Sequence, residues 1–237
     1  ITYPHAKDPP RVMTDPPANF TAWAERNPVG SYRRMFRIDR VPSGRRWFLR
    51  FEGVASAMFV WLNGHFVGYS EDSRGPAEFE VSSFVREGDN LLAVEVYRWC
   101  DGSYLEDQDF WRLSGIFRPV SLWSAPAMFI RDHEVRASFD PASSRGHLEV
   151  VASVEGAGTA ARSLEVHVAL YAPDGQLVAR TNPARIGSDG RATLSLDVRC
   201  AEPWSAESPT LYTATITLGD DRGVLEVLRQ RVGFRTV

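Results

Sequence analysis

The chain has 237 residues, enough for two domains of ordinary size, each with its own hydrophobic core. Hydrophobic residues at 43% and charged residues at 24% are typical of a soluble globular protein and exclude a disordered chain. The net charge of only −3, and the lack of any apolar run near the roughly 20 residues that span a bilayer, give no sign of a nucleic-acid or membrane partner.

The first 20 or so residues are predicted to form an extended arm. Five prolines lie within the first 17 residues, and proline both fixes φ and removes a backbone donor. Neither a regular helix nor a central strand is therefore expected there.

Six short segments with alternating apolar side chains follow the arm, with turn residues between them. They are residues 32–38, 45–53, 57–70, 77–85, 90–99 and 115–123. Within the third, Asn63-Gly64 predicts a hairpin with a type I′ turn, because this turn requires positive φ at both central residues. Short strands with no helix between them predict an antiparallel jelly-roll β-sandwich, which with the arm covers residues 1–125.

The second half repeats this pattern with smaller side chains. Seven strand-like segments cover residues 129–139, 146–156, 163–173, 176–181, 191–199, 211–220 and 224–234. Asp174-Gly175 and Asp189-Gly190 are expected to form turns. The pattern predicts an immunoglobulin-like β-sandwich without a disulfide over residues 126–237. The boundary falls where the aromatic residues become scarce, since 21 of the 27 lie before residue 125.

The cysteines and the first residues bear on the cellular compartment. Cys100 and Cys200 fall in different predicted domains, so we expect two free thiols and a reducing environment. The opening residues ITYPHAKDPP lack the basic-then-apolar order of a secretion signal. Together these features favour a cytoplasmic location.

No motif in the sequence marks a self-contained active site. None of the Ser, Cys and His residues lies in a nucleophile elbow, and none of the five His residues has metal-ligand spacing to another His or Cys. His133, His147 and His167 fall in strand-like segments, where surface or hydrogen-bonded histidines are expected. No glycine-rich phosphate-binding loop is present.

The densest group of acids lies in the stretch SYLEDQDFWR, residues 103–112. Two carboxylates that hydrolyse a glycoside must face each other across a sugar ring, whereas Glu106, Asp107 and Asp109 crowd one short loop. Turn capping or pairing with nearby arginines therefore explains Glu106 and Asp107 better than catalysis; the candidate partners are Arg98, Arg112 and Arg118.

Asp109 differs because it directly precedes Phe110-Trp111, where burial demands a specific cationic or hydrogen-bonding partner. Na⁺, Ca²⁺ or sugar hydroxyls would suit such a carboxylate. A second acidic stretch, residues 71–74, is interpreted as an internal Asp72 to Arg74 pair.

Together these segments resemble the N-terminal sugar-binding domain of a glycoside hydrolase family 2 β-galactosidase. The matching stretches are NPVGSY (27–32), FEGV (51–54), WLNG (61–64), GY (68–69), DSR (72–74), PAEF (76–79), DGSYLEDQDFW (101–111) and SGIFR (114–118). Downstream, PWSAESPTLY (203–212) and VGFR (232–235) resemble the immunoglobulin-like domain that follows in the family. The resemblance covers nearly the whole chain, and residues 103–118 are its most specific part.

The resemblance implies a chain without its own catalytic residues. In the family the two catalytic glutamates lie in a TIM barrel that begins after the Val-Gly-Phe-Arg strand, and this sequence stops at Val237. We therefore expect an inactive fragment of a longer enzyme that hydrolyses terminal β-galactosides with retention. The parent is expected to be a homo-oligomer.

The resemblance also assigns candidate binding residues. It implies that Asp109 contacts galactose near its 6-hydroxyl and helps to hold a sodium ion together with barrel residues. It further implies that Asp101 and Glu71 approach a structural magnesium site, although this family usually has Gln at the position of Glu71. Three alternatives are a free-standing carbohydrate-binding module with an exposed aromatic platform, another family 2 enzyme such as a β-glucuronidase or β-mannosidase, and a pair of sandwiches without a ligand.

Overall fold

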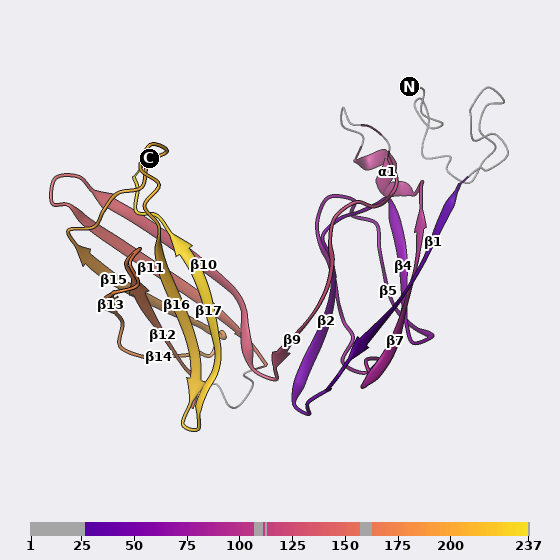
Figure 1. Cartoon of the computed structure of the whole chain (residues 1–237), viewed down its shortest axis with the longest axis horizontal. Helices are drawn as coiled ribbons and strands as arrows, with labels where there is room; N and C mark the ends of the chain where they lie inside the picture. Colours follow the sequence, from indigo (N-terminus) through magenta and orange to yellow (C-terminus); the bar gives the residue numbers. More distant parts are fainter. Residues whose placement is uncertain (1–26, 107–110, 112, 157–162, 237) are drawn as a thin grey trace. The chain divides into compact units, whose positions relative to one another are not determined.

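The computed structural model describes residues 27–106, 111, 113–156 and 163–236 (Figure 1). The described residues form β-strands with one short helix, as expected for an all-β chain. They divide between Ala125 and Pro126 into two compact units. No helix within the described ranges is long and apolar enough to cross a membrane.

Unit 1 is a jelly-roll sandwich of two antiparallel sheets. Sheet A has the order β1 (Val29–Ile38), β7 (Gly88–Tyr97), β4 (Ala57–Leu62) and β5 (His65–Ser70). Sheet B has the order β6 (Ala77–Glu80), β2 (Arg45–Phe51) and β9 (Val120–Pro126), and β3 (Val54–Ala55) pairs with β8 (Gly115–Ile116). Alternate side chains of β4 and β7 face Leu49 and Phe51 of β2 in a shared core, because successive residues of a strand point to opposite faces.

The predicted Asn63-Gly64 hairpin is confirmed. Both residues have positive φ, 53° and 84°, and Leu62 pairs with His65 across the turn. The Asn63 side chain also bonds inward, donating to Asn90 Oδ1 at 2.8 Å and accepting from Leu91 N at 2.9 Å. Asn90 is fully buried and donates in turn to the carbonyls of Arg86 and Gly88. The two amides satisfy each other and the backbone beneath the hairpin, as buried polar groups require.

Unit 2 is an immunoglobulin-like sandwich. Its first sheet has the order β10 (Phe129–Asp140), β11 (Arg145–Glu155) and β15 (Arg191–Arg199). The second has the order β13 (Leu177–Arg180), β12 (Glu165–Tyr171), β16 (Tyr212–Asp220) and β17 (Gly223–Val232), with β14 (Ala184–Arg185) also on β12. The turns predicted at Gly175 and Gly190 are present with φ of 88° and 78°. His147 lies on the surface beside Asp197, and both cysteines are free as expected.

The sequence-based expectations differ from the structure at three places in unit 1. A short helix, α1 (Asp101–Leu105), forms where no helix was expected. The strand expected over 77–85 ends at Glu80, because Phe84 N and Val85 N both bond to the carbonyl of Val81 in a turn. The strand expected over 115–123 is divided into β8 and β9 around Pro119, which has no amide to donate.

Replacing Asn90 with alanine should destabilise unit 1 strongly. Asn90→Ala removes the hydrogen bonds that this fully buried amide makes to the Asn63 side chain and to the carbonyls of Arg86 and Gly88. We expect the free energy of unfolding to fall by about 2–4 kcal/mol, measured by urea denaturation. Asp39→Ala is the control, since the Asp39 side chain is 94% exposed, and should change it by less than about 0.5 kcal/mol. Equal effects of the two substitutions would contradict this role.

Candidate functional site

The acidic stretch begins in helix α1, which is fixed to the sandwich by a chain of hydroxyl groups. Cys100 N donates to Ser103 Oγ at 3.1 Å, which closes the first turn of the helix. Ser103 Oγ donates to Ser56 Oγ at 2.7 Å, and Ser56 Oγ donates to the carbonyl of Arg98 at 3.0 Å. Ser103 and Ser56 are buried, so these bonds replace the water that the hydroxyls would otherwise bind. Burial raises the pKa of the Cys100 thiol, which keeps it protonated.

Glu106 ends the helix and bonds to a neighbouring turn. Its Oε1 accepts a hydrogen bond from Ser73 N at 3.0 Å. Glu106 therefore caps a turn, one of the two structural roles expected for it, with a backbone amide as its partner. Asp107, Asp109 and Arg112 lie outside the described residues.

The turn that Glu106 contacts is organised by Asp72. Asp72 Oδ1 accepts hydrogen bonds from Gly75 N at 2.8 Å and Arg74 N at 2.9 Å. These two amides lower the pKa of the Asp72 carboxyl, because they bind its charged form. The expected pairing of Asp72 with Arg74 is thus made by the Arg74 backbone amide.

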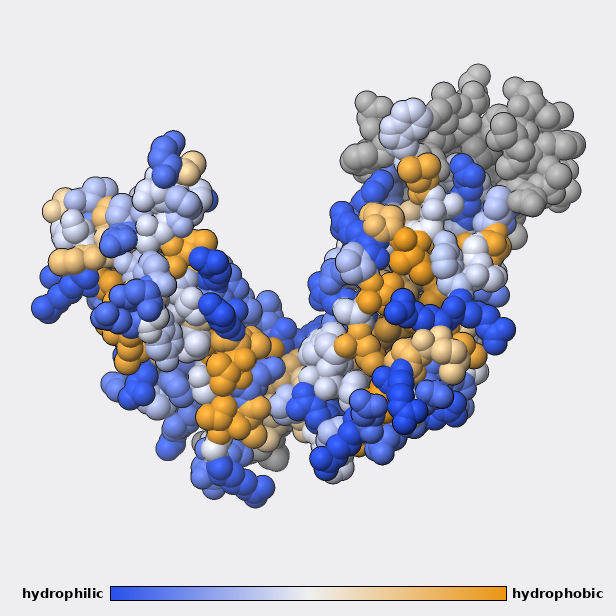
Figure 2. Space-filling model, viewed as in Figure 1, coloured by the Kyte–Doolittle hydropathy of each residue, from blue (hydrophilic) through white to orange (hydrophobic). Residues whose placement is uncertain are grey.

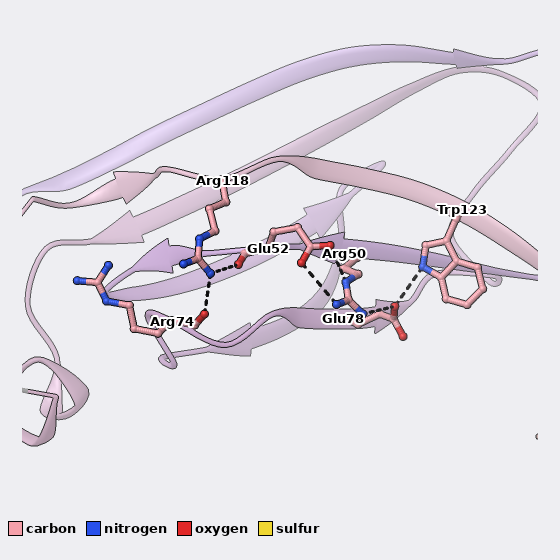
Figure 3. Close-up of polar contacts among 6 residues, drawn as sticks. All are labelled: Arg50, Glu52, Arg74, Glu78, Arg118 and Trp123. Atoms are coloured by element: carbon pink, nitrogen blue, oxygen red, sulfur yellow. Dashed lines mark hydrogen bonds and ion pairs between the residues drawn. The ribbon is translucent and has the colours of Figure 1, made fainter. Parts of the chain in front are cut away.

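Arg118 ties the same turn to sheet B (Figure 3). Its guanidinium donates to the carbonyl of Arg74 at 3.0 Å and to that of Glu52 at 3.3 Å. Phe117 beside it has the guanidinium carbons of Arg74 and Arg118 at 5.4 and 5.3 Å from its ring centroid, within cation–π distance. Gly53 permits this packing, since a Cβ there would lie 2.8 Å from the Phe117 ring.

The outer face of sheet B continues this network away from the acidic stretch. Arg50 pairs with Glu52 at 2.8 Å and with Glu78 at 3.7 Å. Glu78 also accepts from Trp123 Nε1 at 3.1 Å, and Figure 3 shows the four side chains in one row along the sheet. These charges satisfy one another, so they stabilise the sheet and do not form a vacant binding site.

The two residues assigned to magnesium lie near each other. Glu71 accepts a hydrogen bond from the hydroxyl of Tyr69 at 2.7 Å, and burial together with this carboxylate raises the pKa of Tyr69. Gly102, next to Asp101, packs so closely on the Glu71 carbonyl that a Cβ would lie 2.9 Å from it. Within the described ranges, however, no group of three or more His, Cys, Asp and Glu residues could hold a metal ion. Two carboxylates, one already bonded to a phenol, need ligands from elsewhere to complete a magnesium site.

A small pocket adjoins the acidic stretch. Its lining combines the carboxylate of Glu106 with Arg74 and Arg98, and one of its two indoles, Trp111, is 75% exposed. The other lining residues are Ala55, Ser56, Ser73, Trp99, Leu113 and Ser114. The pocket has a volume of only about 20 Å³, enough for about one water molecule, so in the described part of the chain it is too small for a sugar. Among these residues Glu106 is the only carboxylate, so the pocket lacks the pair that glycoside hydrolysis requires.

A cluster of aromatic rings on the outer face of sheet A was not predicted as a site. The Phe59 ring contacts those of Trp61, Phe66, Tyr69 and Tyr97 at centroid distances of 4.7–6.4 Å. Phe66 and Tyr69 are 54% and 44% exposed. The alternation along β4 could have indicated this cluster. Phe59 and Trp61 alternate with the buried Met58, Val60 and Leu62, so the two aromatic side chains lie on the face of the strand away from the core.

Comparison with known families covers almost the whole chain. The model of the sugar-binding domain of glycosyl hydrolases family 2 matches residues 8–126, and a second family 2 model matches residues 128–235.

Two curated relatives are β-galactosidases. One from Priestia megaterium is 42% identical over 241 residues, which cover 100% of this chain and 23% of the relative. One from Halalkalibacterium halodurans is 45% identical over 210 residues, which cover 88% of this chain and 20% of the relative. The chain therefore spans about a fifth of the length of these relatives.

The fold is also found in solved structures. A Bifidobacterium dentium β-glucuronidase complexed with coumarin-3-O-glucuronide superposes with a TM-score of 0.74 at 25% identity, over 87% of this chain and 39% of that one. The aligned region includes residues of both sandwiches, because a single one would cover only about half of the chain.

The Asp72 turn gives a prediction on pH. The pKa of Asp72 in the folded chain lies below its unfolded value of about 3.9. Asp72 therefore stabilises the fold at pH values above the unfolded pKa, and this stabilisation is lost as pH falls through the folded pKa. Asp72→Ala should lower the free energy of unfolding at pH 7 by about 0.5–1 kcal/mol, since solvent weakens the bonds of this exposed residue.

Asp72→Asn is the matched variant, because its amide oxygen still accepts both N–H bonds without a charge. It should retain most of the stability at pH 7, and the difference between wild type and Asp72→Asn should shrink as pH falls below about 3.9 through the lowered folded pKa. Denaturation curves at several pH values measure this, and a pH-independent difference would contradict the assignment.

Proposed function

The chain belongs to family 2 of the glycosyl hydrolases, and we propose that it is the non-catalytic N-terminal part of a β-galactosidase. The observation that carries this proposal is the 42–45% identity to β-galactosidases over 88–100% of the chain, against 25% to the β-glucuronidase structure. The whole enzyme would hydrolyse terminal β-galactosides with retention, using carboxylates outside these 237 residues.

In this proposal unit 1 shapes the substrate pocket. Asp109 contacts the sugar and, with residues of the missing barrel, holds a sodium ion, which would offset the carboxylate charge. Asp109 is a recognition residue and carries no proton in the reaction. Asp101 and Glu71 are proposed to contribute to a magnesium site whose remaining ligands come from outside this chain.

The geometry around the acidic stretch supports a recognition role. Glu106 precedes Asp109 in the sequence and Arg118 follows it. The sandwich holds both, Glu106 through Ser73 N and Arg118 through two backbone carbonyls. A recognition group works best when its support is rigid, because less conformational entropy is lost when the ligand binds. The sandwich thus provides a fixed base for a segment that must meet a sugar held mainly by another domain.

A second candidate function is a carbohydrate-binding module. The exposed Phe66 and Tyr69 rings on sheet A form the aromatic platform that such a module requires. The hydroxyl of Tyr69 is bonded to Glu71, and the hydroxyl of the neighbouring Tyr97 lies near Glu95. Aromatic faces with adjacent acceptor groups suit hydroxylated ligands.

Asp109→Asn in the full-length enzyme tests the first proposal. Losing a hydrogen bond to a charged group should lower kcat/KM for an aryl β-galactoside by about 10- to 150-fold. The pH limbs of the profile should stay in place, because Asp109 moves no proton. Asp107→Asn is the neighbouring control and should retain activity. A parent enzyme that prefers aryl β-glucuronides or β-mannosides would identify another branch of the family.

The 237-residue chain alone should neither hydrolyse β-galactosides nor bind galactose measurably. The reason is that its share of the pocket is incomplete, so few contacts offset the entropy of association. Isothermal titration with galactose in sodium and in potassium buffers measures this. Sodium-dependent tight binding would contradict the proposal, whereas binding that Tyr69→Ala abolishes would favour the binding-module alternative.

A further inference from the structure

Strand β1 exposes side chains on the face that its neighbours bury. The register pairs Tyr32 with Val94 and Arg34 with Leu92, and residues directly opposite each other share a face. Val94 and Leu92 belong to the core, yet Tyr32 is 41% exposed and Arg34 is exposed as well. The inward face of β1 therefore lies open at these positions.

The open face lines a groove between the two sheets of unit 1. The groove has a volume of about 780 Å³, with Leu49 and Phe51 of β2 and Leu122 of β9 facing Tyr32 and Phe36 of β1. In the view of Figure 2, apolar side chains gather between the paths that β1 and β2 follow in Figure 1. In the described part of the chain sheet B ends at β9, so the groove beside Tyr32 and Arg34 has β2 and β9 as its opposite wall and no further strand beyond β9.

We propose that this groove receives an additional β-strand, which pairs with the free edge of β9 and completes sheet B opposite β1. The strand comes from the same longer polypeptide, outside these 237 residues, so the inference rests on the proposal that the chain is part of a larger enzyme. The curated relatives, which are about five times as long, supply ample chain for it.

The lining determines the chemistry of the added strand. β9 is an edge strand of sheet B in the described structure, so its outer backbone groups are available for a ladder. Inward positions of the added strand must be apolar to pack on Tyr32, Phe36 and Leu122. Arg34 has no hydrogen bond or ion pair within the described ranges, and covering its guanidinium without an acceptor would be costly. The added strand therefore carries Asp or Glu where it meets Arg34.

A second copy of the chain fits the groove less well. A symmetric dimer joins the same patch of both molecules, so two concave surfaces would face each other and two Arg34 side chains would approach. Like charges in such an interface are destabilising. A small apolar ligand would fill the groove but would leave the edge of β9 unpaired.

Thiol labelling of the full-length enzyme tests the proposal. Arg34→Cys places a thiol in the groove, and Arg37→Cys places one on the opposite face of β1, where the side chain is 67% exposed. Rates are followed by peptide mass spectrometry with iodoacetamide. In the 237-residue chain the two thiols should react at similar rates, whereas in the full-length enzyme the thiol at position 34 should react at least roughly 30-fold more slowly. The thiol at position 37 should change little.

A charge reversal tests the predicted carboxylate. In the full-length enzyme with Tyr32→Cys as reporter, Arg34→Glu should raise the labelling rate about ten-fold, because the added strand would then meet a like charge. Arg37→Glu is the matched control and should leave the rate unchanged.

Three outcomes would overturn the inference. The thiol at position 34 could react as fast in the full-length enzyme as in the 237-residue chain. It could already be protected in the dilute 237-residue chain. Its protection could also depend on protein concentration, as in a dimer. None of these readouts uses hydrolysis. A galactosidase with a reactive position 34 would therefore refute the added strand alone, and a protected position 34 in an enzyme of other specificity would refute only the galactoside assignment.

Discussion

Buried polar groups must be hydrogen-bonded, and in unit 1 this requirement fixes where the acidic stretch begins. Ser103 cannot leave its buried position without breaking its bond to Ser56 and removing the hydroxyl that accepts from Cys100 N. Helix α1 is too short to be stable alone, since an isolated helix of five residues does not offset the cost of nucleation. Its existence depends on these tertiary bonds, and the direction of the chain toward Glu106 follows from them.

The outer face of sheet B, the outer face of sheet A and the groove between the sheets differ in how many of their side chains have a partner within unit 1. On the outer face of sheet B the charges of Arg50, Glu52 and Glu78 pair with one another. On the outer face of sheet A aromatic rings contact each other but leave Phe66 and Tyr69 exposed. Between the sheets, Tyr32 and Arg34 point inward, and no strand among the described residues covers them. Binding capacity is therefore expected on the last two surfaces, because an already satisfied network gains little from a ligand.

The strand pattern was predictable from the sequence because it depends on local rules. Alternation along β4 and β7 and the glycine at position 64 act over two to four residues, so they act the same way in any sandwich. Helix α1 was missed because it depends on distant partners. Ser103 meets Ser56 across 47 residues, and Glu106 meets Ser73 across 33. A sequence shows that Glu106 needs a hydrogen-bond donor, but it does not show that a backbone amide will supply it.

The role proposed for Asp109 has a consequence for sugar preference that does not involve the chemical step. A glucuronide carries a carboxylate on the carbon where a galactoside carries its 6-hydroxyl. Two unit charges 4 Å apart repel by about 4 kcal/mol at the effective dielectric constant near a protein surface, roughly a factor of 10³ in binding, and this is the upper limit for a carboxylate whose charge a sodium ion partly offsets. A hydroxyl at the same place instead donates a hydrogen bond worth about 1.5–3 kcal/mol to the charged acceptor. One carboxylate can thus favour one sugar and reject the other. Such a residue acts through binding alone, so it can lie on a sandwich apart from the carboxylates proposed to carry out the reaction.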